Sequence, residues 1–244
     1  MKKLAIISAL ALLAASCTQD AGLTYSGKDK IYFTYNYTLL NQVINFDKVT
    51  FSFGMKPEQV IKDTAKIAVR VMGQRSDKDR QYRLSIDNDS TTAIPGVHYE
   101  VLPPLQTFQK GIFEDTLRIV VLRSSLNGSH ITQENRRLRL RMESSDDFDN
   151  GTKQGAAIDL YINNYLSEPR WWKQYEGSGL YYYHPEKWKI LMTFHDNFKD
   201  PNKDYPMDAN LVYSYFSSLR NYLIQNPTYD KETRARVLID KLVP

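Results

Sequence analysis

Few side chains in this sequence of 244 residues have the types and the spacing that metal chemistry requires. The four histidines, His98, His130, His184 and His195, are never three or four residues apart, which is the spacing that puts two metal ligands on one helix face. His195-Asp196 could contribute to a metal site, but we interpret His195 as a turn residue that follows a strand. The sequence therefore predicts no metal site.

Motifs for catalysis are also absent from the sequence. It contains no G-x-S-x-G, H-E-x-x-H, Walker or G-x-G-x-x-G pattern. The acidic run ESSDDFDNGT (143–152) does not fit an EF-hand, because Phe148 stands at a ligand position and no glutamate closes the loop, so we interpret it as a polar hairpin turn. Two distant carboxylates could still pair to hydrolyse a glycoside, but nothing singles out such a pair. We expect a noncatalytic protein without a cofactor.

The only cysteine, Cys17, lies in the segment LLAASCTQD (12–20). Lysines at positions 2 and 3, an apolar run over 4–13 and small residues at 14–16 precede it, which is the layout of a secretory signal too short to cross a bilayer permanently. A cysteine directly after the small residues is the bacterial lipoprotein pattern, although Ala14 stands where that pattern prefers leucine. We predict a signal peptide over 1–16 and diacylglycerol plus an acyl chain on Cys17; the alternative is an ordinary cleaved signal and a free thiol.

The chain after the signal has the composition of a folded, water-facing protein. Residues 17–28 are polar and carry two glycines, which predicts a flexible, lipid-anchored tether. Loss of Lys2 and Lys3 leaves 30 basic against 28 acidic residues, and this near-neutral balance argues against nucleic acid as a partner. We expect contact with the membrane only through the anchor.

Residues 29–165 alternate between apolar and polar side chains in short segments. In RRLRLRME (136–143), for example, Leu138, Leu140 and Met142 share one face and arginines occupy the other. Comparable alternation or buried runs occur at 30–38, 48–55, 65–73, 81–87, 116–122 and 156–164. Period-two alternation between turn signals predicts antiparallel strands, and this number of strands predicts an immunoglobulin-like β-sandwich.

The pattern changes in residues 166–244, for which we predict a smaller, aromatic-rich α+β module. A helix is expected over 208–227, with Asp208 as its N-cap and Asn226-Pro227 as its stop. A shorter second helix is expected over 229–243, with Asp230 as its cap, and WKILMTF (188–194) is interpreted as one further strand. The protein is thus predicted to be mainly β.

An aromatic group in this module is the strongest candidate for contact with a ligand or partner. It comprises Trp171, Trp172, Tyr181, Tyr183 and Trp188. Exposed rings of this kind stack on sugars or grip peptide side chains. The alternative, which we favour for the group as a whole, is a buried seam between the sandwich and the module. At least one of the adjacent Trp171 and Trp172 is expected to be exposed or at an interface.

One segment resembles a known repeat. AIPGVHYEVLPPLQTFQKGIFEDTLRIVVL (93–122) is similar to Calx-β-type immunoglobulin-like repeats at Ala93, Gly96, Tyr99, Thr107-Phe108, Gly111 and the strand 116–120. His98 replaces the usual aspartate, and Leu122-Arg123 stands where calcium-binding members have acids. The resemblance supports a sandwich and gives no support to calcium binding.

With its lipid-anchor pattern, its Ala-x-x-Gly-x-x-Tyr element and its Trp- and Tyr-rich helical tail, most of the mature chain resembles an uncharacterised family of Bacteroidetes surface lipoproteins encoded beside SusC/SusD-type importers. Asp20 close behind Cys17 suits surface export in that phylum. The resemblance implies an outer-membrane lipoprotein on the extracellular side, an accessory subunit that works with a SusC-like barrel and a SusD-like lipoprotein on oligopeptide or glycan cargo. It offers no catalytic residues. The alternatives are a stand-alone glycan-binding lipoprotein that uses exposed Trp and Tyr, and a hydrolase of unrecognised type.

Overall fold

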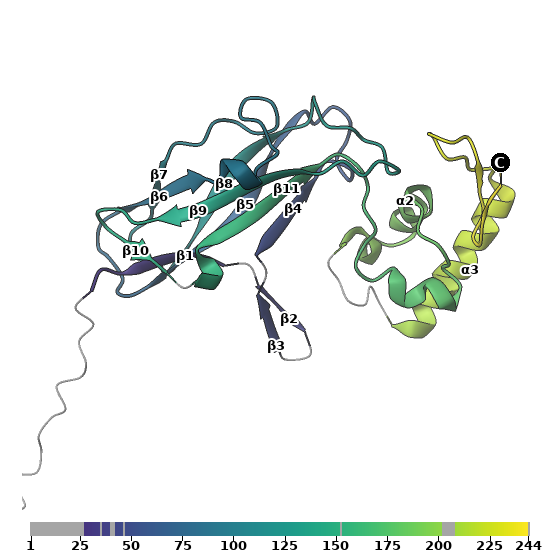
Figure 1. Cartoon of the computed structure of the whole chain (residues 1–244). Coiled ribbons are helices and arrows are strands. Elements are labelled where there is room, and N and C mark those ends of the chain that lie inside the picture. Colours follow the sequence, from purple (N-terminus) through teal and green to yellow (C-terminus); the bar gives the residue numbers. More distant parts are fainter. Residues whose placement is uncertain are drawn as a thin grey trace, which may run out of the picture.

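The computed structural model describes residues 27–34, 36–39, 42–45, 47–151, 153–201 and 208–243. The predicted signal peptide, the lipidation of Cys17 and all of the tether up to residue 26 lie outside the described residues. The described chain forms a β-sandwich and, at its C-terminal end, a smaller module of helices and short strands (Figure 1). Every helix in these ranges is too short or too polar to cross a membrane.

Two sheets form the sandwich. The first has the order β10(Asp149–Asn150), β1(Lys30–Thr34), β5(Lys62–Met72) and β8(Glu114–Leu122). The second has the order β4(Lys48–Ser52), β11(Ala157–Asn163), β9(Arg136–Glu143), β6(Arg80–Ile86) and β7(Leu105–Phe108). The pairing is antiparallel except for β1 with β10 and β4 with β11, and β2(Asn36–Leu39) and β3(Gln42–Asn45) form a separate hairpin. The predicted mainly β fold is confirmed.

Alternation along the strands builds the sandwich core. On β9, Leu138, Leu140 and Met142 are at most 2% exposed, as their spacing predicts, whereas the intervening arginines face outward. Tyr99, from the Calx-like segment, is buried in the same cluster. The acidic run after β9 is a turn as predicted, but it does not close a hairpin. The strand that follows the turn, β10, pairs with β1 in the first sheet, whereas β9 belongs to the second sheet.

The C-terminal module contains α2(Pro185–Phe194), α3(Ala209–Gln225) and the strand pair β12(Arg236–Val237) and β13(Leu242–Val243), with the 3-10 turns η3(Lys173–Ser178) and η4(Asp196–Lys199). Two further 3-10 turns, η1(Asn88–Ser90) and η2(Lys153–Gly155), lie in the sandwich. The helix predicted over 208–227 is confirmed as α3, and Asp208 caps it by accepting from the Asn210 N–H.

Two predicted elements of the module are wrong. Residues 188–194 lie in α2 and not in a strand, because His184 caps the chain and Pro185 stands in the first turn, and both favour a helix. Residues 229–243 form turns and a short strand pair and not a helix. There Arg234 has a left-handed φ of 66°, and the buried residues Ala235, Val237 and Ile239 recur at period two.

Candidate functional site: a cleft with a histidine cluster

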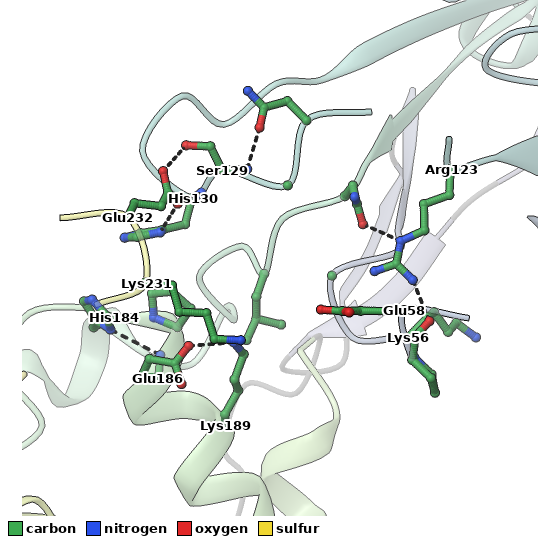
Figure 2. Close-up of a pocket in the computed structure, with 17 residues that line it drawn as sticks. Lys56, Glu58, Arg123, Ser129, His130, His184, Glu186, Lys189, Lys231 and Glu232 are labelled. Atoms are coloured by element: carbon green, nitrogen blue, oxygen red, sulfur yellow. Dashed lines mark hydrogen bonds and ion pairs between the residues drawn. The ribbon is translucent and has the colours of Figure 1, made fainter. Parts of the chain in front are cut away.

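A cleft of about 710 Å³ lies where loops of the sandwich meet the C-terminal module (Figure 2). The sandwich contributes the loop after β4 (54–58), Arg123 and the loop residues 127–130. The other wall comprises Asn164 and Leu166, the first turn of α2 with Lys189, and the pair Lys231-Glu232. Residues from five separated stretches of sequence, 54–58, 123–130, 164–166, 184–189 and 231–232, therefore surround one volume.

Charged side chains of both signs line this interdomain cleft. Lys189 pairs with Glu186 at 2.7 Å, and Lys231 lies at the rim on an exposed turn. Arg123 Nε donates to Asn164 Oδ1 at 2.8 Å, and its guanidinium also donates to the Pro57 carbonyl. This arginine therefore connects the loop after β4 to the segment after β11. None of the described residues that line the cleft is Trp, Tyr or Phe. The described lining residues thus offer mainly ionic and hydrogen-bonding contacts.

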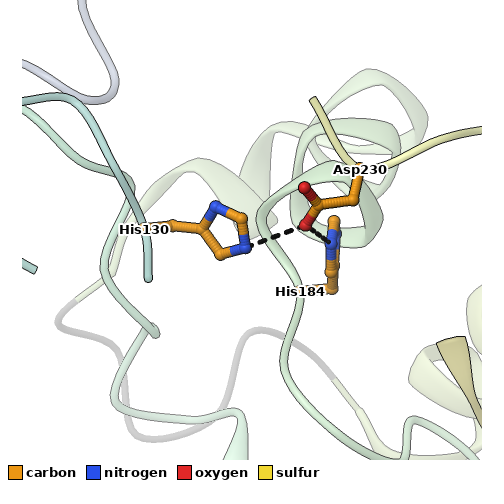
Figure 3. A group of neighbouring side chains, drawn as sticks. All are labelled: His130, His184 and Asp230. Carbon is orange, nitrogen blue, oxygen red and sulfur yellow. Dashed lines mark hydrogen bonds and ion pairs between the residues drawn. The ribbon is translucent and has the colours of Figure 1, made fainter. Parts of the chain in front are cut away.

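At one side of the cleft, His130 and His184 point toward the same carboxylate oxygen of Asp230 (Figure 3). The Nε2 atom of His130 lies 3.0 Å from Asp230 Oδ2, and His184 Nε2 lies 2.8 Å from the same oxygen. His184 and Asp230 are almost fully buried, whereas the His130 side chain is 22% exposed. The histidine cluster thus joins a sandwich loop to the module.

Local structure holds each member of the cluster in place. His184 is the N-cap of α2, and its Nδ1 accepts from the Glu186 N–H at 3.2 Å. Asp230 Oδ1 accepts from the backbone N–H groups of Glu232 and Thr233 at 2.7 and 2.8 Å, which leaves Oδ2 for the histidines. His130 Nδ1 lies 2.6 Å from Glu232 Oε1.

The electrostatics of the cluster follow from burial and these hydrogen bonds. Burial lowers the pKa of His184, an effect that the bond to Asp230 partly offsets. Burial raises the pKa of Asp230, but the Thr233 N–H, His184 and the Glu232 N–H outweigh it and bring the value to about 2. Burial likewise raises the pKa of Glu232, and bonds from Ser129 and His130 bring it below its ordinary value. Two ionised carboxylates therefore surround two imidazoles.

The structure buries all three tryptophans of the aromatic group, so the expectation that Trp171 or Trp172 is exposed is wrong. Trp171, Trp172 and Trp188 are at most 1% exposed, and they lie within the core of the module, neither on a surface nor at a seam with the sandwich. Their indole N–H groups donate to the carbonyls of residues 200, 181 and 198. Both adjacent tryptophans point inward because they lie in turns, where the Trp172 N–H donates to the Pro169 carbonyl, and strand alternation does not apply.

The two tyrosines of the aromatic group are less buried. Tyr183 is partly buried, and its hydroxyl donates to the Leu166 carbonyl. Tyr181 is 39% exposed, so it alone of the five rings meets the expectation of an exposed side chain. Arg220 of α3 lies over the Tyr181 ring at 5.8 Å.

The histidine cluster was not predicted from the sequence. The interpretation of His195 as a turn residue is confirmed, because its Nδ1 accepts from the Asn197 N–H at the start of η4. His195 follows the helix α2, however, and not a strand. His130, His184 and Asp230 lie in three loops far apart in sequence. The only local signal was Asp230, which was recognised as a cap but for a helix that does not form.

Comparisons with known proteins find distant similarities to solved structures. No curated protein matches the chain. The Calx CBD1 domain in its apo form is 15% identical, with a TM-score of 0.37, over 57% of this chain and 98% of that one. A protein of unknown function from Bacteroides ovatus is 19% identical, with a TM-score of 0.36, over 54% and 43% of the two chains. A "putative carbohydrate binding protein" from Bacteroides ovatus ATCC 8483 is 10% identical, with a TM-score of 0.36, over 57% and 38%.

A family assignment comes from the sequence itself. Residues 25–195, which span the sandwich and the module as far as the end of α2, match one family over more than half of the chain. The chain belongs to the family described as Domain of unknown function (DUF4843).

Proposed function

We propose that this protein is a noncatalytic, surface-exposed outer-membrane lipoprotein, an accessory subunit of a SusC/SusD-type importer, and that its interdomain cleft binds oligopeptide cargo. The observation that carries the binding role is the cleft of about 710 Å³, lined by charged side chains of both signs. Ligands usually bind in concave sites of this size, into which a few polar groups point. The cleft also joins two parts of the chain, where such sites are common.

The chemistry of the cleft favours a peptide over a neutral glycan. A free peptide carries an amino group at one end and a carboxylate at the other, and these match the exposed Glu58 carboxylate and the Lys189 and Lys231 ammonium groups. A neutral glycan would instead be expected to stack on Trp, Tyr or Phe rings, and none of the described lining residues supplies one of these. Burial of Trp171 and Trp172 likewise removes the aromatic surface on which a stand-alone glycan binder would depend.

The anchor and the partners are proposed from the sequence. Lipid on Cys17 would hold the protein at the membrane, with the tether residues 17–28 between the anchor and the sandwich. Confinement to the membrane raises the effective concentration of a protein around its partners, so weak contacts with a SusC-like barrel and a SusD-like lipoprotein suffice. Mass spectrometry of Cys17 and a mild-detergent pull-down from native membranes test these two parts; an unmodified thiol, or purification without a barrel protein, would contradict them.

Binding of peptides is tested by calorimetry on the full-length chain in detergent, with defined mixtures of short peptides and of neutral oligosaccharides as ligands. The double variant Lys189→Ala/Lys231→Ala is expected to bind peptides about tenfold more weakly or worse, because it removes two charge-assisted contacts. The matched control is Lys66→Ala/Lys110→Ala, which makes the same change in net charge at exposed positions outside the cleft. Equal weakening by both double variants, or binding of oligosaccharides alone, would contradict the proposal.

A further inference from the structure

We propose that His130, His184 and Asp230 bind one divalent cation of the zinc type, with an open coordination position toward the interdomain cleft. The proposal is independent of the cargo, because it concerns only side chains of this chain. The three donor atoms, two imidazole nitrogens and one carboxylate oxygen, all lie within 4.8 Å of one another. Two histidines and one carboxylate are the protein ligands of many open zinc sites, in which a fourth position holds water or a ligand.

The hydrogen bonds around His130 indicate that a positive charge belongs between its ring and Asp230. Its Nδ1 faces the Glu232 carboxylate at 2.6 Å, so in the neutral ring this nitrogen carries the proton and donates it. The other nitrogen, Nε2, then presents a lone pair to Asp230 Oδ2 at 3.0 Å, which is an acceptor facing an acceptor. A metal ion between the two atoms converts this repulsion into two coordinate bonds.

The surroundings have the features that orient metal ligands. A carboxylate on the second nitrogen of a ligating histidine, as Glu232 is on His130, holds the ring and raises its basicity. Asp230 Oδ1 is held by two backbone N–H groups, so Oδ2 keeps its direction. Zinc bonds of about 2.0–2.1 Å place donor atoms about 3.3 Å apart, so each donor needs to move by only about 1 Å or less.

Metal binding has an identifiable cost at His184. In the metal-free arrangement its Nδ1 accepts from the Glu186 N–H, so the proton sits on Nε2 and is donated to Asp230. Coordination through Nε2 requires the neutral ring to carry its proton on Nδ1, so the cap contact of 3.2 Å from the Glu186 N–H has to open. This contact is at the long end of the range for such bonds, and Pro185 still favours the helix start without it.

Occupancy of the site would join three segments. His130 comes from a sandwich loop, His184 from the start of α2 and Asp230 from the chain after α3. The ion would therefore fix the module against the sandwich and put a Lewis acid on the wall of the cleft. The competing account is a proton on His130 in place of the metal ion, which would hold the same atoms together without zinc.

The test uses the full-length chain in detergent after removal of metals with a chelator. Calorimetry with Zn²⁺ and absorption spectra with Co²⁺ are expected to show one ion per chain, a low-symmetry Co²⁺ spectrum and a higher melting temperature. His130→Ala and His184→Asn should abolish all three, and Glu232→Gln should weaken zinc binding by roughly tenfold or more. Asparagine at 184 can still cap α2, so that variant loses the ligand and not the helix start.

His195→Asn is the matched control, since it removes an imidazole and keeps a capping oxygen at a position outside the cluster. It should bind zinc as the unmodified protein does. Failure of the unmodified protein to bind micromolar zinc would overturn the proposal in favour of a protonated cluster. Equal affinity in the His130→Ala and His184→Asn variants would overturn it in favour of adventitious binding elsewhere.

Discussion

Substitution of Trp172 by alanine is expected to lower the free energy of unfolding of the C-terminal module by about 3–5 kcal/mol. The side chain is fully buried, stacks on Trp171 with ring centroids 5.6 Å apart, and contacts Tyr183 edge-on at 5.0 Å. Truncation leaves a cavity the size of an indole, and the Tyr181 carbonyl loses its N–H donor at 3.0 Å. Urea unfolding followed by near-UV circular dichroism measures the change.

The control for this variant is Tyr181→Ala, from the same aromatic group. Tyr181 is 39% exposed, so its truncation should cost about 1 kcal/mol or less. The sandwich has a separate hydrophobic cluster, and its unfolding should shift little in either variant. If Trp172 instead served a ligand, Trp172→Ala would leave stability unchanged and reduce binding, and that result would contradict the structure.

The second large effect is expected at Lys187, a fully buried lysine in α2. Its ammonium group donates to the carbonyls of Leu180 at 2.8 Å and Ile239 at 2.9 Å and to that of Tyr182, and it lies 3.9 Å from the centroid of the Tyr182 ring. Lys187→Met keeps the approximate volume but leaves three carbonyls without this donor. We expect a loss of about 3 kcal/mol or more in the free energy of unfolding.

Trp fluorescence during urea unfolding measures this loss, because all three tryptophans are in the module. Lys189→Met is the matched control on the same helix, since Lys189 is 42% exposed and its pair with Glu186 should contribute at most about 0.5 kcal/mol. Similar losses in the two variants would show that the charge of the helix, and not the three carbonyl contacts, is what matters.

The same lysine gives a pH dependence with a definite sign. Burial lowers the pKa of Lys187 from 10.5 to about 7, so between these values the unfolded chain holds a proton that the folded chain has released. The free energy of unfolding should therefore rise as the pH increases above about 7, by at most about 1.4 kcal/mol per pH unit. Lys187→Met should lack this rise. An equally steep rise in that variant would assign it to another group.

Local sequence patterns predicted secondary structure correctly where one face of an element is buried and the other is exposed to solvent. The strands of the sandwich and α3 follow their periodicity, and Asp208 caps α3 as its type and position predict. The run 188–194 was ambiguous because a short apolar stretch fits a strand or a buried helix equally well. The cap at His184 and the proline after it decided for a helix.

The tryptophans show a different limit. Their type suggested a contact surface, but ring chemistry is the same in a core as on a surface, and only the packing of α2, α3 and the turns around 169–181 buries them. Similarly, Asp230 was recognised as a cap, yet its carboxylate holds a tight turn and two histidines, and the left-handed Arg234 ends any helix there.

Periodicity and residue order along the chain were enough to identify the mainly β class, the positions of most strands, α3 and the membership of one family. The places of the candidate sites depend instead on contacts between distant segments. His130, His184 and Asp230 stand in loops with no period, and residues of five stretches make the cleft. Their proximity follows from how the module packs against the sandwich loops, and no spacing within a single segment encodes that contact.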